Sequence, residues 1–249
     1  MFKQSCIIEI DDNNLIKYNF PSNLFKKAYK KNEYNINLLK EGQFNISRGK
    51  AFIVLEGEKI NIKYMTFPRV KKQQLYSLIL EELAYSIRSI EKIYFNFSII
   101  KTDAKNLNIV VFYSSEGKIK KLDKYIHNSC IKRVNLIQFC YLKYYGKNIK
   151  HENFIFAFLY KSKLYNLCCI NKKLAYNSVV SIEENKENLV QSLYEFIESC
   201  RISSDLSINE IYLSNIQEQI YEAINLIGYH VINLGNMEEK NLADSIRRK

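Results

Sequence analysis

Few side chains of this sequence have the types and the spacing that catalysis requires. Glu81-Glu82 and Glu183-Glu184 are adjacent carboxylate pairs, but neighbouring residues of a helix point about 100° apart and do not face a common site. No histidine forms a recognisable nucleophile arrangement with a serine or cysteine, although a triad can also be assembled from residues distant in sequence. We therefore expect a protein that is not an enzyme, and we predict no catalytic residue.

The cysteines and histidines do not form a metal-binding pattern. None of the six cysteines is in a C-x-x-C motif, and only three histidines could join them. Cys168 and Cys169 are adjacent, so on a strand they would point to opposite faces and would not share a ligand. Cysteines without such spacing usually pack as small apolar side chains. We predict free, buried thiols and no metal site.

The composition is that of a globular protein with a basic surface. The 249 residues are 47% hydrophobic, and 37 Lys and Arg against 26 Asp and Glu give a net charge of +11. Such a charge permits contact with nucleic acid, anionic lipid or an acidic protein segment. The lysines are scattered, however, and aromatic residues such as Phe95, Phe97 and Phe156 fall on the apolar side of predicted strands. A nucleic-acid-binding module stays an alternative, but we expect no nucleic-acid partner.

The sequence carries no recognisable targeting signal. Residues 1–5 are followed by only a short strand-like run, which Asp11 and Asp12 interrupt. No apolar run approaches the roughly 20 residues of a transmembrane helix. We therefore expect a cytoplasmic protein.

The elements that would position a site are organised around residues 64–90. Pro68 ends an extended segment, because it fixes its own φ and disfavours the α region for Phe67. Alternating apolar residues at 93–99 and the run 107–113 predict two strands further on. Between Pro68 and the first of these strands, apolar residues at three- and four-residue spacing predict one helix with a buried stripe: Leu75, Tyr76, Ile79, Leu80, Leu83, Ile87 and Ile90.

Both halves of the chain begin with strands joined by turns and end with alternating helix and strand. The first half has predicted strands at 7–10, 15–20, 51–55 and 59–64, a weak helix at 26–39, a helix at 119–126 and an extended segment at 134–139. The second half has predicted strands at 154–159, 164–170, 174–182, 210–213 and 229–234, helices at 188–200 and 216–227, and a polar segment at the end. We expect 51–55 and 59–64 to form a hairpin. The fold class is α/β.

This order of elements resembles the actin-like ATPase superfamily, and within it the PilM proteins of type IV pilus assembly and the related cytoplasmic domain of GspL in type II secretion. The best segment is the strand 59–64, the pair Phe67-Pro68 and an amphipathic helix with Leu80-Glu81-Glu82 in its middle. The resemblance implies an actin-like fold with two large subdomains, one small inserted α/β subdomain and a reduced second half. Its implied domains are residues 1–65 plus about 140–152, residues 66–139, and residues 153–249.

The turns that bind nucleotide in this superfamily differ here. Phosphate-binding hairpins need bare backbone N–H groups, which glycine leaves accessible. The first hairpin instead reads Asp11-Asp12-Asn13-Asn14, the second reads Leu159-Tyr160-Lys161-Ser162-Lys163, and the adenosine-side turn reads Leu213-Ser214-Asn215-Ile216. With only 7 glycines in the chain, no other Gly-rich loop replaces them. We expect no cofactor, neither ATP nor Mg²⁺, and an actin-like ATPase or filament former with atypical loops is the alternative.

The resemblance implies a non-catalytic cytoplasmic scaffold of a type IV pilus or related secretion machine, peripheral at the inner face of the plasma membrane. A groove between the first large subdomain and the inserted subdomain would receive the cytoplasmic tail of a PilN-like inner-membrane protein, as grooves and sheet edges capture extended peptides. Other pilus assembly components would be further partners, and the basic surface would favour anionic lipid. Phe67, Tyr94 and Tyr113 are the candidate partner-binding residues, with core packing as the other interpretation.

Overall fold

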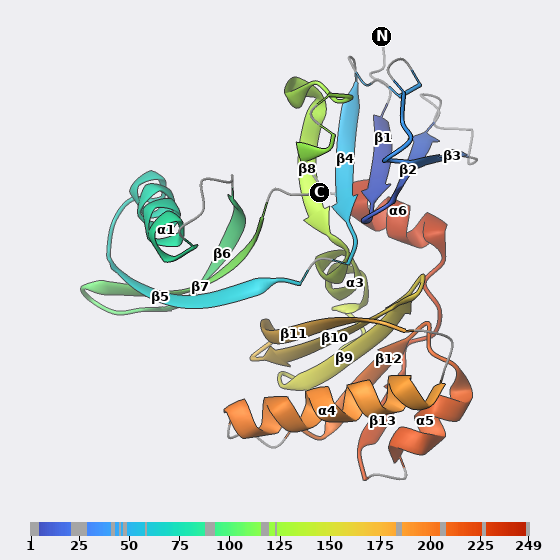
Figure 1. Ribbon diagram of the computed structural model, residues 1–249. Helices are drawn as coiled ribbons and strands as arrows, with labels where there is room; N and C mark the ends of the chain where they lie inside the picture. The colour runs from blue at the N-terminus through green and yellow to red at the C-terminus, as the bar shows by residue number, and fades with distance from the viewer. Residues whose placement is uncertain are drawn as a thin grey trace. The chain divides into compact units, whose positions relative to one another are not determined.

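The chain divides into two compact units. The computed structural model describes residues 5–20, 29–40, 43–44, 46, 49–57, 59–87, 93–115, 120–122, 124–182, 186–204, 208–225 and 228–247. Met1–Glu58 with Lys121–Lys249 forms the large unit, and Lys59–Lys120 forms the inserted unit. Figure 1 shows the two sheets of the large unit and the smaller sheet of the inserted unit.

The first sheet of the large unit has strand order β3-β2-β1-β4-β8. β1 pairs with β2 in antiparallel and with β4 in parallel orientation, and β8 extends the parallel part. Because β1 is central, its residues from 6 to 10 are all buried. The strand bounds are Ser5–Ile10 for β1, Asn14–Phe20 for β2, Lys30–Asn35 for β3, Lys50–Leu55 for β4 and Ile131–Leu136 for β8.

The second sheet repeats this topology with strand order β11-β10-β9-β12-β13. Again three strands pair in antiparallel orientation and two more join in parallel. Helix α4 (Lys186–Ser204) crosses one face, as Figure 1 shows, and packs with α5 (Glu218–Asn225) on an apolar core. The strand bounds are Phe154–Tyr160 for β9, Lys163–Ile170 for β10, Lys173–Ser181 for β11, Glu210–Ser214 for β12 and His230–Asn233 for β13.

Helix α3 (Ile137–Tyr145) joins the two sheets through aromatic side chains. The ring of Tyr141 stacks on Phe158 with centroids 3.8 Å apart, and Tyr145 meets Phe156 edge-on at 5.7 Å. Such pairs contribute about 0.5–1.5 kcal/mol beyond the area that they bury. The other face of the second sheet is therefore packed rather than exposed.

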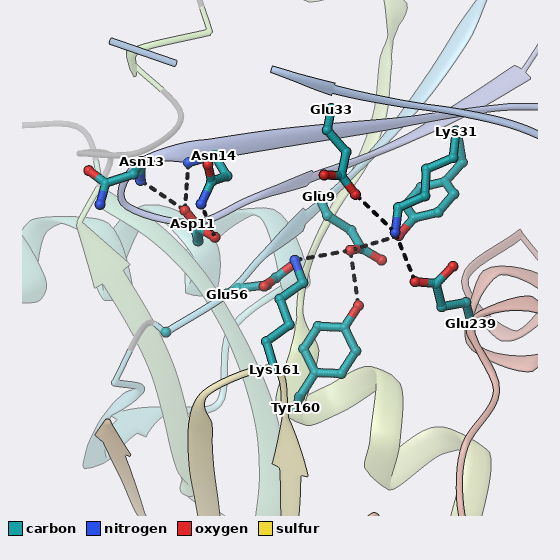
Figure 2. A network of polar contacts seen from close by, with 12 residues as sticks. Glu9, Asp11, Asn13, Asn14, Lys31, Glu33, Glu56, Tyr160, Lys161 and Glu239 are labelled. Carbon is teal, nitrogen blue, oxygen red and sulfur yellow. Dashed lines mark hydrogen bonds and ion pairs between the residues drawn. The ribbon is translucent and has the colours of Figure 1, made fainter. Parts of the chain in front are cut away.

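Helix α6 (Glu239–Arg247) is an element that the sequence analysis missed. The segment was predicted only as polar, yet Leu242, Ala243 and Ile246 are buried at helical spacing. Glu239 accepts a hydrogen bond from Lys31 of β3 at 3.1 Å (Figure 2). The last helix is thereby held to the first sheet.

The inserted unit is a three-stranded antiparallel sheet covered by one helix. Its strands are β5 (Asn61–Pro68), β6 (Ile93–Thr102) and β7 (Asn106–Ser115), with β7 in the centre. Helix α1 (Lys72–Ile87) lies over one face, as Figure 1 shows. It buries Leu75, Ile79 and Leu83 of the predicted stripe, whereas Tyr76 and Leu80 of that stripe are exposed.

Two strands pair differently from their prediction. The strand predicted at 59–64 was expected to form a hairpin with 51–55, but it is β5 and pairs along its length with β7. Residues 131–136, expected within the insertion, are β8 and pair with β4. The inserted unit accordingly runs from 59 to 120, where the resemblance implied 66 to 139. Alternation marks a half-buried strand but does not specify its partner.

Three further segments differ in type from their prediction. In the expected weak helix 26–39, residues 30–35 are strand β3, and 26–28 lie outside the described residues. In the expected helix 119–126, Lys120 is helical, residues 121, 122, 124 and 125 form turns, and Ile126 forms an isolated bridge with Ile46; residues 119 and 123 lie outside the described residues. The extended segment predicted at 134–139 becomes helix α3 from Ile137 onward. Ile90, Glu183 and Glu184 also lie outside the described residues.

Candidate functional site

Two buried glutamates lie at the same end of the central strands of the first sheet. Glu9 is in β1, Glu56 directly follows β4, and their exposed fractions are 3% and 2%. The two strands are parallel neighbours that pair Ile10 with Leu55, and Glu56 N donates to Ile10 O at 2.9 Å. Burying carboxyl groups is costly unless they are paired and hydrogen-bonded.

Lys161 supplies the cation that both glutamates face, as Figure 2 shows. It occupies the turn between β9 and β10 with φ 54°, a left-handed conformation that is uncommon for lysine. Its Nζ lies 2.7 Å from Oε1 of Glu56 and 3.5 Å from Oε2 of Glu9. The hydroxyls of Tyr160 and Tyr18 donate to Oε2 of Glu9 at 2.9 and 3.1 Å. The second sheet thus contributes a cation and a hydroxyl to a carboxyl pair of the first.

Burial controls the charge of this network. Burial, followed by the Glu9 carboxylate, raises the pKa of Glu56 to about 8, although Lys161 opposes the shift. Burial alone would lower the pKa of Lys161, but Glu56 and Glu9 outweigh it and raise that pKa. Burial and then Glu9 also raise the pKa of the Tyr18 and Tyr160 phenols. These shifts oppose the ionisation of Glu56 and favour the charged form of Lys161, whose Nζ donates to Oε1 of Glu56.

The first hairpin turn satisfies its own backbone. Oδ1 of Asp11 accepts the N–H groups of Asn13 at 2.8 Å and Asn14 at 2.6 Å (Figure 2). Asp11 N in turn donates to Asn14 O at 3.0 Å. Such side-chain-to-backbone bonds are typical of Asx turns. The N–H groups that a phosphate-binding hairpin leaves bare are already bonded here.

A second set of contacts joins the β9–β10 hairpin to the first sheet. Nζ of Lys163 lies 3.2 Å from Oδ2 of Asp12, and the N–H of Gly57 donates to the Tyr165 hydroxyl at 2.8 Å. Gly57 has φ 72°, and a Cβ at this position would collide with Lys163. Lys163 could move its flexible end away from such a Cβ, so this position favours glycine because of its φ.

The third turn, which is the adenosine-side turn Leu213-Ser214-Asn215-Ile216, is held in place by Asn215. Its φ is 57°, and its side chain donates to the Tyr141 hydroxyl at 2.8 Å and to Leu159 O at 3.0 Å. Its Oδ1 accepts Met237 N at 2.7 Å. Oγ of Ser214 lies 2.9 Å from the hydroxyl of Tyr145. The side chains of Ser214 and Asn215 thus form hydrogen bonds within the protein that glycines at these positions could not form.

A cavity of about 580 Å³ lies beside the third turn. The described residues of its lining include no lysine or arginine, and Glu218 contributes a carboxylate. The residues are Asn215, Ile216, Gln217, Glu218, Tyr221, Asn233, Gly235 and Asn236. Phosphate groups are bound by cationic side chains and by unbonded backbone N–H groups. The described lining supplies no cationic side chain for a phosphate.

The predicted partner-binding residues lie in the inserted unit but not on one face. Phe67 of β5 and Tyr113 of β7 are partly buried and pack against the core beneath α1. Ile93 and Phe95 pack against that core too, so Tyr94 between them points to the opposite face of the sheet. The structure separates Tyr94 from the other two.

The cysteines are free and buried, as predicted. Within the described ranges, no three His, Cys, Asp or Glu side chains are placed to hold a metal ion. His151 and His230 both approach Glu210, at 3.7 and 2.6 Å, without a further ligand of this kind.

Sequence reasoning missed Glu9, Glu56 and Lys161 as a group. One local signal was available, because Glu9 interrupts the apolar run Ile7-Ile8-Glu9-Ile10 and a charged residue inside a buried strand usually has a partner. Lys161 carried no such signal in its polar turn.

Solved structures resemble this chain at low sequence identity. A protein from Bacteroides thetaiotaomicron VPI-5482 with an actin-like ATPase fold and unknown function is 10% identical, with TM-score 0.55 over 100% of this chain and 97% of that one. A chain of the PilM–PilN type IV pilus biogenesis complex is 10% identical, with TM-score 0.61 over 98% and 95%. The cytoplasmic domain of EpsL, an inner-membrane component of the type II secretion system of Vibrio cholerae, is 10% identical, with TM-score 0.51 over 97% and 94%. No family model and no curated protein matches the sequence.

The chain has the actin-like ATPase fold, with two mixed sheets and a small antiparallel inserted sheet. The fold class predicted from the sequence is confirmed. Among the described helices, none is both long and apolar enough to cross a membrane.

Proposed function

We propose that this chain is a non-catalytic scaffold of a pilus or secretion assembly machine, and that it binds the short cytoplasmic segment of an inner-membrane protein. It would work without nucleotide, in the cytoplasm and at the inner face of the membrane. The partner segment would be of the PilN type.

One observation carries the proposal: Lys161 occupies the meeting point of the two hairpins. A nucleotide phosphate there would have to displace Nζ of Lys161 from Glu56, 2.7 Å away, and would then face the buried Glu9 and Glu56 carboxyl groups. It would also need backbone donors, but Asp11 already accepts those of Asn13 and Asn14. Each of these costs opposes phosphate binding. The network closes the two sheets on each other with side chains of the chain itself.

The likeness in fold supports the class of machine. By their own descriptions, one of the similar solved structures is a type IV pilus biogenesis complex and another is the cytoplasmic domain of an inner-membrane component of a type II secretion system. In the inserted unit, β5 and β6 are the edge strands of the sheet. Edge strands offer unpaired backbone groups that an extended peptide can bond.

A thermal melt of the full chain with and without millimolar Mg-ATP tests the nucleotide part. A ligand at about 100 times its dissociation constant adds about 2.7 kcal/mol and raises the midpoint by several degrees. We expect no shift. A clear shift would mean that the loops bind nucleotide in spite of the network, and the actin-like ATPase alternative would replace the scaffold.

Peptide titration tests the partner part. Fluorescent peptides would be made from the cytoplasmic segments of single-span membrane proteins encoded beside this chain, and we expect one of them to bind. Tyr94→Ala should weaken that binding, whereas Tyr85→Ala, at an exposed tyrosine of the same unit, should not. If no peptide binds but DNA binds with a steep salt dependence, the nucleic-acid alternative is favoured instead.

A further inference from the structure

One end of the inserted unit gathers five basic residues from two chain segments. The β5–α1 link and the β6–β7 turn lie side by side there, since Arg69 N donates to Lys105 O at 2.9 Å and Pro68 pairs with Asn106. All five basic side chains are exposed. We call this end the basic tip, and its cations are Arg69, Lys71, Lys72, Lys101 and Lys105.

Little negative charge balances the basic tip. Across residues 68–76 and 97–107, Asp103 is the single acidic residue, and it lies 3.4 Å from Nζ of Lys101. The first turn of α1 contains no acidic residue, so Lys71 and Lys72 adjoin the positive end of the helix dipole. This placement is unfavourable for the helix. Its effect is to strengthen the positive potential of the tip.

Exposed isoleucines accompany these cations. The register of β6 shifts between Ile99 and Lys101, which leaves Ile100 as the extra residue of a bulge. Bulges re-aim side chains, and here Ile99 and Ile100 are 47% and 44% exposed in succession. Ile99 also lines a depression that it shares with Arg69 and Lys72. Apolar side chains and cations therefore share one surface.

We propose that the basic tip docks the chain onto an anionic lipid bilayer. The cations would face lipid phosphates and carboxylates, while Ile100 would enter the boundary between headgroups and acyl chains. Nucleic acid fits this surface less well, because isoleucine neither stacks on bases nor bonds their edges. Four of the five cations are lysines. Lysine acts as a point charge and does not form the bidentate hydrogen bonds with which arginine recognises one particular anion. The inference does not rest on the proposed function, since it concerns the lipid itself.

Because the sequence contains no tryptophan, a single introduced tryptophan would be the source of all tryptophan fluorescence. The Ile100→Trp variant of the full chain would be titrated with two kinds of vesicle. One kind contains phosphatidylcholine alone, and the other contains about 30% of the anionic lipid phosphatidylglycerol. We expect emission to shift to shorter wavelength only with the anionic vesicles, and the shift to weaken as salt is raised. Because the vesicles contain no protein, this outcome is independent of any peptide partner or nucleotide.

Sedimentation with the same vesicles tests the residues. The Lys71→Ala, Lys72→Ala double variant should bind about 25-fold more weakly, from about fivefold for each cation. Ile100→Ser should cost about tenfold. The matched control removes two exposed cations from the large unit, Lys147→Ala with Lys150→Ala, and should retain the binding. Circular dichroism would establish that each variant is folded.

Three results would overturn the inference. The first is a failure to bind anionic vesicles, and the second is binding that the Lys71 and Lys72 double variant retains. The third is equally tight binding to soluble polyglutamate with no effect of Ile100→Ser, which would make the tip a site for an acidic protein segment.

Discussion

Nζ of Lys161 lies 2.7 Å from Oε1 of Glu56 across 105 residues of sequence. This pair joins the turn between β9 and β10 to the end of β4, and so joins the two sheets of the large unit. No bound ligand is needed for the contact. The large unit therefore has its own means of holding its hairpins together.

Replacing Lys161 with methionine should destabilise the fold, because Glu9 and Glu56 would lose the cation that they share. Breaking a fully buried ion pair costs about 3–5 kcal/mol. The Lys161 side chain is 35% exposed, so we expect about 2 kcal/mol, read from urea unfolding. Lys163→Met is the control, since its partner Asp12 is 64% exposed and such pairs contribute about 1 kcal/mol or less. Equal losses in the two variants would contradict the role given to Lys161.

Glu56 should make the unfolding free energy fall as the pH rises from 4.5 to 8. Burial raises its pKa from 4.5 to about 8, so in this window the folded state holds a proton that the unfolded state has released. The contribution of Glu56 to the free energy of unfolding is complete below pH 4.5 and is lost as the pH rises through 8. Its slope is at most about 1.4 kcal/mol per pH unit.

Glu56→Gln removes this titration. The difference in unfolding free energy between wild type and variant should change with pH from 5 to 8, with the wild type losing more. Glu195→Gln, at an exposed glutamate of α4, should give a profile parallel to the wild type. Parallel profiles for Glu56→Gln as well would refute the assignment.

Asn215 has two roles, its side-chain hydrogen bonds and its left-handed backbone conformation, and two substitutions test them separately. Asn215→Gly keeps the left-handed backbone but loses hydrogen bonds to Tyr141, Leu159 and Met237, which at about 1 kcal/mol each gives a loss of about 2–3 kcal/mol. Asn215→Ala should lose about 1 kcal/mol more, because alanine is strained at φ 57°. Chemical unfolding measures both. At Asn171, an exposed left-handed turn residue, the glycine variant should have little effect. A similar loss there would show that the loss at Asn215 comes from the flexibility of glycine in the unfolded chain and not from the hydrogen bonds.

The sequence by itself determined most of the local elements and their order, but not β3, α3 or α6. The stripe of α1 was predictable because Leu75, Ile79 and Leu83 repeat with the period of a helix. The departures at the three turns were also visible, since glycine is either present or absent at a turn. The actin-like fold class came from the resemblance of the order of elements to that superfamily.

Only the tertiary structure decided which segments meet. Periodicity tells which face of a segment is buried but not what buries it, so the alternation at 59–64 could not distinguish β4 from β7 as its partner. For the same reason, Lys161 looked like a solvated lysine in a polar turn. Its meeting with Glu9 and Glu56 depends on how two sheets pack, and that packing is set by contacts between residues more than a hundred positions apart.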